Sequence, residues 1–220
     1  MELKKEIRHI KVKKSILIIL IIMFLFYLMI AVLKFLKIHD INKKLTSYKS
    51  IDNYYYELIE YNYNQNIIIT NCWYKDGILR LQYKENITWI DYKNNEGYLL
   101  DSNKMEGYKI ESQDYIIKEG NGLYSIFPTT LNNNNNIFIE FVLALNPFFS
   151  IKEKDYMENS RCYVVKIANQ KLILEKETAF PITLMSNDNS HTNYKQYKIR
   201  LNEVTDKDIE EIDLTSYTIY

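Results

Sequence analysis

Glycine and proline are scarce in this chain, with five and three residues among 220. The sequence contains no glycine-rich loop of the kind that cradles phosphate groups and no Gly-x-Ser-x-Gly motif around a nucleophilic serine. No linker rich in Pro, Gly or Ser divides its C-terminal part, and a length of this order is ample for one hydrophobic core. Residues 53–220 are therefore predicted to form a single domain.

Histidine and cysteine are also rare, with three and two residues. His9, His39 and His191 have no carboxylate or cysteine partners at the spacing of a metal site, and no His-x-x-x-His pair occurs. These absences predict no metal, no cofactor and no catalytic residues. The sequence is thus not expected to be that of an enzyme.

An excess of positive charge is missing as well, since 28 basic residues balance 28 acidic ones. Proteins that bind nucleic acids neutralise phosphates with clustered Lys and Arg, and the domain after the basic N-terminus is slightly acidic. We therefore expect no nucleic acid partner.

One long apolar run is present at residues 15–33, SILIILIIMFLFYLMIAVL. At about 1.5 Å per residue, such a helix nearly crosses a hydrocarbon core of about 30 Å. The run is apolar all round, unlike the helix of a soluble core. It is also longer than a signal-peptide core, and no small-x-small cleavage site follows it. The sequence therefore predicts an uncleaved transmembrane anchor over residues 15–36.

Basic residues flank this run and predict its orientation. A short basic head before a first span normally stays in the cytoplasm. Residues 1–14 are therefore expected to be cytoplasmic, and the C-terminal domain extracytoplasmic, on a single-pass protein of the cell membrane. The head carries six basic residues: Lys4, Lys5, Arg8, Lys11, Lys13 and Lys14.

The many Tyr, Asn, Lys and Ile residues share A/T-rich codons, which indicates a low-GC Gram-positive bacterium.

Short runs rich in Ile, Tyr, Val and Trp recur about every ten residues between turn residues, as in an antiparallel meander. Asp76-Gly77 is a hairpin signal, because Gly readily adopts the positive φ of tight hairpin turns. The pattern predicts strands over residues 54–63, 67–74, 78–83, 87–92, 98–102, 115–118, 162–168, 171–177, 182–186 and 194–204.

Two segments have helical character. Residues 45–52 are expected to form a short helix within a juxtamembrane linker, 37–52. An alternative extends this helix further, because Tyr48, Ile51, Tyr55 and Leu58 have helical spacing. Residues 137–145, IFIEFVLAL, are predicted to be a helix that ends before Pro147. Its apolar stripe consists of Phe138, Phe141, Val142 and Leu145.

A set of positions in the C-terminal third and one upstream stretch, Trp73-Tyr74-Lys75-Asp76-Gly77 with Arg80, form a further pattern. The late positions are Glu175, Glu177, Thr178, Pro181, Tyr197, Asn202 and Val204. This pattern resembles the bacterial lipoprotein-carrier superfamily, whose members include LolA, LolB and RseB-like domains. The upstream stretch is similar to the second hairpin of that family, while Ala179 stands where its glycine is usual.

The resemblance implies an α+β fold: a strongly curved antiparallel sheet, or half-barrel, with helices covering its concave face. In relatives that hollow holds acyl chains, and a sheet of this shape needs helices or lipid to cover it. The side chains expected to line it are Trp73, Leu81, Trp89, Phe138, Phe141, Val142 and Leu145. Ordinary core packing is the alternative interpretation of the same residues.

Cys72 and Cys162 leave two alternatives open. On the oxidising side of the membrane they can form a disulfide that stabilises the domain. Both also lie in apolar strands, where a free cysteine behaves as a small hydrophobic residue.

Two functions follow as hypotheses. The first is a membrane-anchored domain that binds a lipid or lipoprotein acyl chain in an open hollow. The second is a sensor or regulatory module with a filled hollow that binds an envelope protein. An open apolar cavity favours the first, and a filled core with an exposed apolar edge favours the second.

Overall fold

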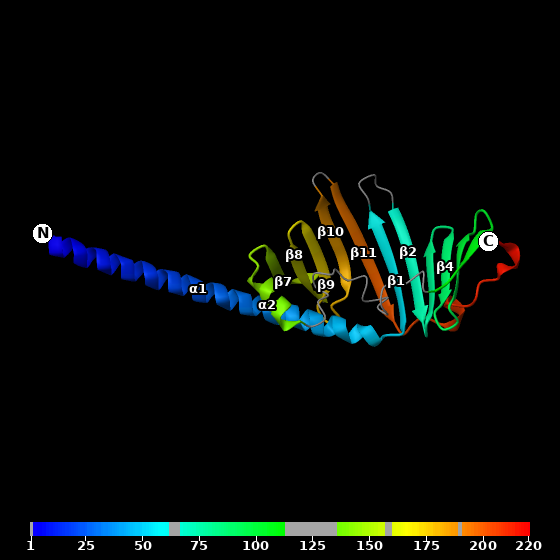
Figure 1. The fold of residues 1–220 in the computed structure, drawn as a ribbon, viewed down its shortest axis with the longest axis horizontal. Helices are drawn as coiled ribbons and strands as arrows, with labels where there is room; N and C mark the ends of the chain where they lie inside the picture. Colours follow the sequence, from blue (N-terminus) through cyan, green and yellow to red (C-terminus); the bar gives the residue numbers. More distant parts are fainter. Residues whose placement is uncertain (1, 62–66, 113–135, 157–159, 189–190) are drawn as a thin grey trace.

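A long helix leads into a large antiparallel sheet in the computed structural model of the chain, which describes residues 2–61, 67–112, 136–156, 160–188 and 191–220 (Figure 1). Helix α1 (Glu2–Ser47) contains neither Gly nor Pro, so no residue in it breaks the backbone hydrogen bonding. A short 3-10 turn, η1 (Tyr48–Ser50), follows, and Ile51 then adopts an extended conformation. One helix therefore includes both the apolar run and most of the predicted linker.

Twelve strands of the described chain form one sheet in the order β12-β6-β5-β4-β3-β2-β1-β11-β10-β9-β8-β7. All neighbours pair antiparallel except β12 and β6, which are parallel. The strands are β1 (Asn53–Tyr61), β2 (Ile67–Lys75), β3 (Ile78–Tyr83), β4 (Asn86–Asp91), β5 (Glu96–Asp101), β6 (Glu106–Ile110), β7 (Phe149–Tyr156), β8 (Ser160–Ile167), β9 (Gln170–Glu175), β10 (Pro181–Asp188), β11 (His191–Leu201) and β12 (Thr218–Ile219).

Local turn chemistry explains the meander. Asp76 and Gly77 have φ values of 50° and 87°, the positive values of a tight two-residue hairpin, and Lys75 pairs with Ile78 across it. Ala179, which replaces the glycine usual in the resembling family, has a φ of 60° in the region that favours glycine. The chain thus makes a positive-φ turn there without a glycine.

Helix α2 (Ile137–Leu145) has the bounds predicted from sequence, and Asn136 caps its N-terminus. The α+β class, an apolar N-terminal helix before a curved antiparallel sheet with a second helix, is confirmed. Strands β6, β7 and β12 were not predicted. The strand expected at 115–118 lies outside the described residues. Helical structure does not extend through the first strand, which begins at Asn53.

The two faces of the sheet carry different side chains. We call the face that packs against α1 the helix face; its largest cluster includes Ile38, Ile41 and Leu45 from α1. We call the opposite face the tail face, because Val204, Ile209 and Ile212 from the C-terminal segment pack on it. Successive strand residues alternate between these faces, so each position on a strand belongs to one of them.

Candidate functional site

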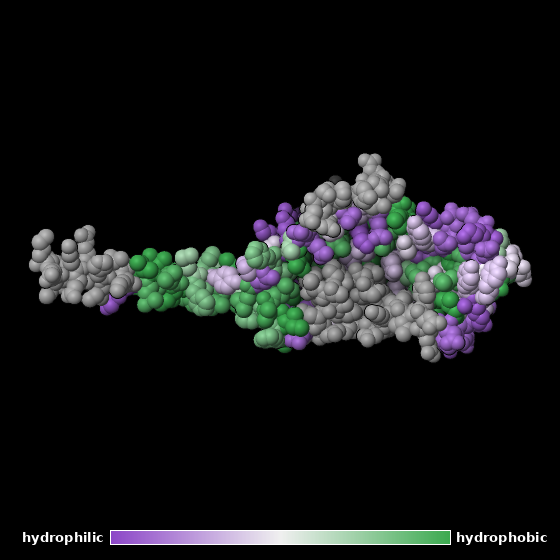
Figure 2. Space-filling model, turned by 45° about the horizontal axis from the view of Figure 1, so that its top comes forward, coloured by the Kyte–Doolittle hydropathy of each residue, from purple (hydrophilic) through white to green (hydrophobic). Residues whose placement is uncertain are grey.

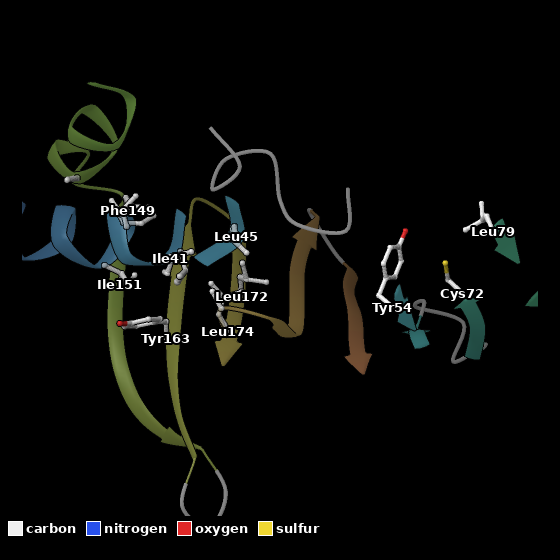
Figure 3. Packing of buried hydrophobic residues seen from close by; sticks show 14 of the residues in the cluster. Ile41, Leu45, Tyr54, Cys72, Leu79, Phe149, Ile151, Tyr163, Leu172 and Leu174 are labelled. Carbon is white, nitrogen blue, oxygen red and sulfur yellow. The ribbon is translucent and has the colours of Figure 1, made fainter. Parts of the chain in front are cut away.

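The helix face is the candidate site, and the last turns of α1 cover part of it. Ile38 and Ile41 are fully buried, and Leu45 is nearly so. Figure 3 shows Ile41 and Leu45 pointing toward side chains of β7, β8 and β9, among them Ile151, Tyr163 and Leu172. The segment interpreted from sequence as a linker therefore forms part of the hydrophobic core.

Polar contacts fix the end of α1 to the sheet. Lys44 Nζ donates to the carbonyl of Lys176 over 2.7 Å, and Tyr48 Oη donates to that of Thr178 over 2.6 Å. Tyr163 Oη lies 3.1 Å from Oδ2 of Asp40. These bonds hold α1 in one position on the helix face.

Tyrosines dominate the helix face on strands β1 and β2. The ring centroid of Tyr54 lies 5.0 Å from that of Tyr74 and 6.4 Å from that of Tyr56. Burial raises the pKa of Tyr54 and Tyr56 above the ordinary tyrosine value. In the described part of the chain Tyr54 Oη is buried without a hydrogen-bond partner, which costs free energy in a folded protein.

Around this buried centre the helix face carries apolar side chains that are only partly buried. Leu81, one of the predicted lining residues, is among them. The others in the same cluster include Tyr56, Tyr74, Tyr92, Leu184 and Ile199. We call this set the tyrosine rim; it is the apolar surface of the helix face that remains accessible.

Trp73 and Trp89, two other predicted lining residues, lie on the tail face. Trp89 is buried with Tyr98 and Leu100 against Ile212, and its Nε1 donates to the carbonyl of Ile209 over 3.1 Å. Neither tryptophan can line a hollow on the helix face. The sequence-based prediction failed here because it did not establish which strand residues share a face.

The two tryptophans belong to a row that crosses the tail face from β11 to β6. Each strand contributes one residue to this row, and that residue pairs directly with the row residue of the next strand. The row consists of aromatic rings and basic side chains, which contact one another through ring stacking and cation–π interactions. The guanidinium of Arg200 lies 4.4 Å from the ring centroid of Tyr55, and that of Arg80 lies 5.6 Å from Trp73. This row is a structural support for the C-terminal segment.

Helix α2 packs on α1 with the face opposite to the predicted one. Its buried residues are Glu140 and Ala144, whereas Phe138, Phe141 and Val142 are exposed and Leu145 is only partly buried. The predicted stripe was taken as the packed face because apolar residues usually turn inward from water. The signal that was missed is Glu140, the one charged residue of α2.

Glu140 has defined partners on α1. Its Oε2 lies 2.9 Å from Nδ1 of His39, and its Oε1 accepts from Nδ2 of Asn42 over 2.9 Å. The side chain of Glu140 has no exposed surface. A buried carboxylate needs such partners, because its desolvation is otherwise very costly. The polar network therefore fixes the position of α2 along α1.

Cys72 and Cys162 are both free and buried, so the disulfide alternative is not realised. Four strands separate β2 from β8, which places the two backbones on the order of 20 Å apart along the sheet. A disulfide needs Cα atoms within about 7 Å. Cys72 lies in the helix-face cluster, whereas Cys162 packs with Val164 and Ile173 on the opposite face.

We expect both thiols to resist labelling in the folded protein. Burial raises the pKa of Cys72 from its ordinary 9.0 to about 12 and also raises that of Cys162. With a thiol reagent at pH 8, the native chain should react at least tenfold more slowly than the unfolded chain, which should expose two equivalents. Because the unfolded thiol ionises first, the stabilising contribution of Cys72 should decline as pH rises from 9.0 toward about 12. Rapid native labelling at pH 8 would contradict this prediction.

Two grooves of the described residues contain no residue of the tyrosine rim. One of them is lined by Lys44, Arg161, Glu175 and Lys176 among others. Within the described ranges, no three His, Cys, Asp or Glu side chains gather closely enough to hold a metal ion.

No model of a known protein family matches the sequence, and no curated protein matches it either. Solved structures that match include an uncharacterized conserved protein from Thermus thermophilus, with 7% identity over 82% of this chain and 96% of that chain, at a TM-score of 0.46. A LolA superfamily protein from Nitrosomonas europaea matches with 7% identity over 78% of this chain and 96% of that chain, at a TM-score of 0.29. MucB in complex with MucA(peri) matches with 9% identity over 80% and 60% of the two chains, at a TM-score of 0.37. Similarities this distant assign neither a family nor a function.

Proposed function

We propose that this chain is a membrane-anchored, non-enzymatic protein whose sheet domain binds the acyl chain of a lipid or lipoprotein. In this proposal residues 15–36 span the membrane, residues 1–14 lie in the cytoplasm, and residues 53–220 form an extracytoplasmic domain. The described part of α1 has one stretch that is long and apolar enough to cross a membrane. The Gram-positive origin remains a prediction.

One observation carries the proposal. Most apolar residues of α1 between Ile16 and Leu36 are exposed, although Ala31 is buried and Leu28 and Phe35 are partly buried. The same helix becomes buried on the helix face at Ile38 and Ile41. A membrane around the exposed stretch would therefore lie directly beside the helix face. The tyrosine rim belongs to the same apolar cluster as the buried end of α1, so an acyl chain that leaves the membrane would meet apolar side chains there.

The binding proposal is tested by native mass spectrometry, with lipid extraction, of the full chain from a bacterial membrane fraction. Leu81→Asn should reduce the co-purifying acyl species at least fivefold, because it adds an amide to the tyrosine rim. Ile87→Asn is the matched control: Ile87 is also partly buried, but it packs on the tail face. A wild-type chain without acyl species, or equal loss in both variants, would refute binding at this site.

A second candidate function is a protein-interaction or signalling module on the same fold. The specific observation in its favour is the complete burial of Leu79 and Ile90 at the centre of the helix face, together with Cys72. A closed centre leaves less room for an acyl chain than an open hollow does. If no lipid co-purifies, pull-down of an envelope protein by the full chain becomes the test of this function.

A further inference from the structure

Helix α2 has an inverted arrangement of polar and apolar groups for a helix at a water surface. Its one charged side chain, Glu140, is directed at α1, and its outward residues are all apolar. Phe138 is 74% exposed, and Phe148, just after the helix, is 81% exposed. An apolar patch of this kind on a soluble surface marks a contact with another apolar phase. The outward residues of the patch are Ile137, Phe138, Ile139, Phe141, Val142 and Phe148.

The patch is continuous with the exposed apolar surface of α1. Helix α2 lies beside α1, and the rings of Phe35 and Phe141 are in edge contact with centroids 6.2 Å apart. Tyr27 Oη donates to the carbonyl of Leu145. In Figure 2 the hydrophobic surface of α1 continues onto the adjoining part of the domain.

Several backbone groups at both ends of α2 have partners within the protein, which favours a helix in contact with hydrocarbon. At its start, Oδ1 of Asn136 accepts from the amides of Phe138 and Ile139 over 3.1 and 3.3 Å. Beyond its end, Lys34 Nζ donates to the carbonyls of Asn146 and Phe149 over 3.3 and 2.7 Å. Side chains of Asn136 and Lys34 thus satisfy these terminal groups.

We infer that α2 is a second membrane element, which inserts its apolar face into the outer leaflet of the bilayer beside α1. The inference rests on the proposed span at residues 15–36. The contact with Tyr27 places the C-terminal end of α2 nine residues inward from Leu36, a depth of about 13 Å. Its N-terminal end lies near His39, at the level of the lipid head groups. The domain is therefore held to the membrane at two elements rather than one.

Depth-dependent fluorescence quenching tests the inference on the full chain. Phe148→Trp and Phe138→Trp add a probe on the patch, and Tyr108→Trp adds one on β6, where Tyr108 is 55% exposed. All three variants keep Trp73 and Trp89 as a common background. The chain is reconstituted in phosphatidylcholine and phosphatidylglycerol vesicles at 3:1, with or without brominated acyl chains. The added signal should fall at least twofold for Phe148→Trp, less for Phe138→Trp, and not at all for Tyr108→Trp.

Two failures can be told apart by floating the vesicles on a density gradient. If the chain floats but Phe148→Trp is quenched no more than Tyr108→Trp, the inference is wrong and the anchor stands. A chain that does not float refutes the anchor and the inference together. Blue-shifted Phe148→Trp emission without quenching would mean that protein, such as a second copy of the chain, covers the patch, and this also overturns the inference.

Discussion

Replacing both Ile38 and Ile41 by alanine should unfold most of the sheet domain, although both residues lie in the helix that precedes it. Each side chain is fully buried in the helix-face cluster. A buried Ile→Ala change costs about 2–5 kcal/mol, whereas a folded domain is stable by only about 5–15 kcal/mol. The double variant is therefore expected to lose a large share of the total free energy of unfolding.

Trp73 and Trp89 fluorescence in a denaturant titration of the reconstituted full chain measures this loss. Ile18→Ala with Ile22→Ala is the matched control, because both residues lie in α1 and are more than half exposed. The control variant should unfold at the wild-type denaturant concentration. Equal stability of the Ile38/Ile41 variant and the wild type would show that α1 is only a tether. A truncated chain without Ile38 and Ile41 should be destabilised for the same reason.

Asn42→Leu is expected to destabilise the contact between α1 and α2 by about 2–3 kcal/mol. The change keeps the branched shape of the side chain, with a modest increase in its volume, but removes the donor that serves Oε1 of the buried Glu140. A carboxylate oxygen that loses its partner in the interior retains its full desolvation cost. The measurement is the rate of limited proteolysis near α2, together with denaturant titration of the full chain.

A second substitution makes this prediction specific to the buried charge. Glu140→Met removes the carboxylate, so the combined variant Asn42→Leu with Glu140→Met should regain most of the lost stability, as apolar replacements of buried polar pairs often do. Glu203→Ala, which breaks an exposed pair with Arg200, should have no measurable effect. If the combined variant is less stable than Asn42→Leu alone, the Glu140 network does not act as described.

Features that depend on nearby residues could be predicted from the sequence. The Asp76-Gly77 turn requires positive φ values, which these two residues accept, and the hairpin formed where expected. Helix α2 has the predicted bounds, since Asn136 caps its start and Pro147 prevents its continuation. Strand β7 was missed because its inward-facing Phe149 and Ile151 are followed by four consecutive charged residues, 152–155, so the alternating pattern that indicates a strand stops after Ile151.

The candidate site was much less predictable than the elements. Of the predicted lining residues, Leu81 lies in the helix-face cluster, whereas Trp73 and Trp89 lie on the tail face. Ile38 and Ile41 were taken as part of a linker, although with Leu45 they form an apolar stripe at helical spacing. This stripe was the available signal for the buried end of α1.

The sequence by itself determined the apolar stretch of α1, the antiparallel meander and the extent of α2, because each follows from composition and backbone preferences over a few residues. Only the tertiary structure decided which faces are buried. Glu140 turns inward because His39 and Asn42, about 100 residues earlier, supply its hydrogen bonds. That pairing leaves the apolar face of α2 outward, an orientation that no local pattern contains.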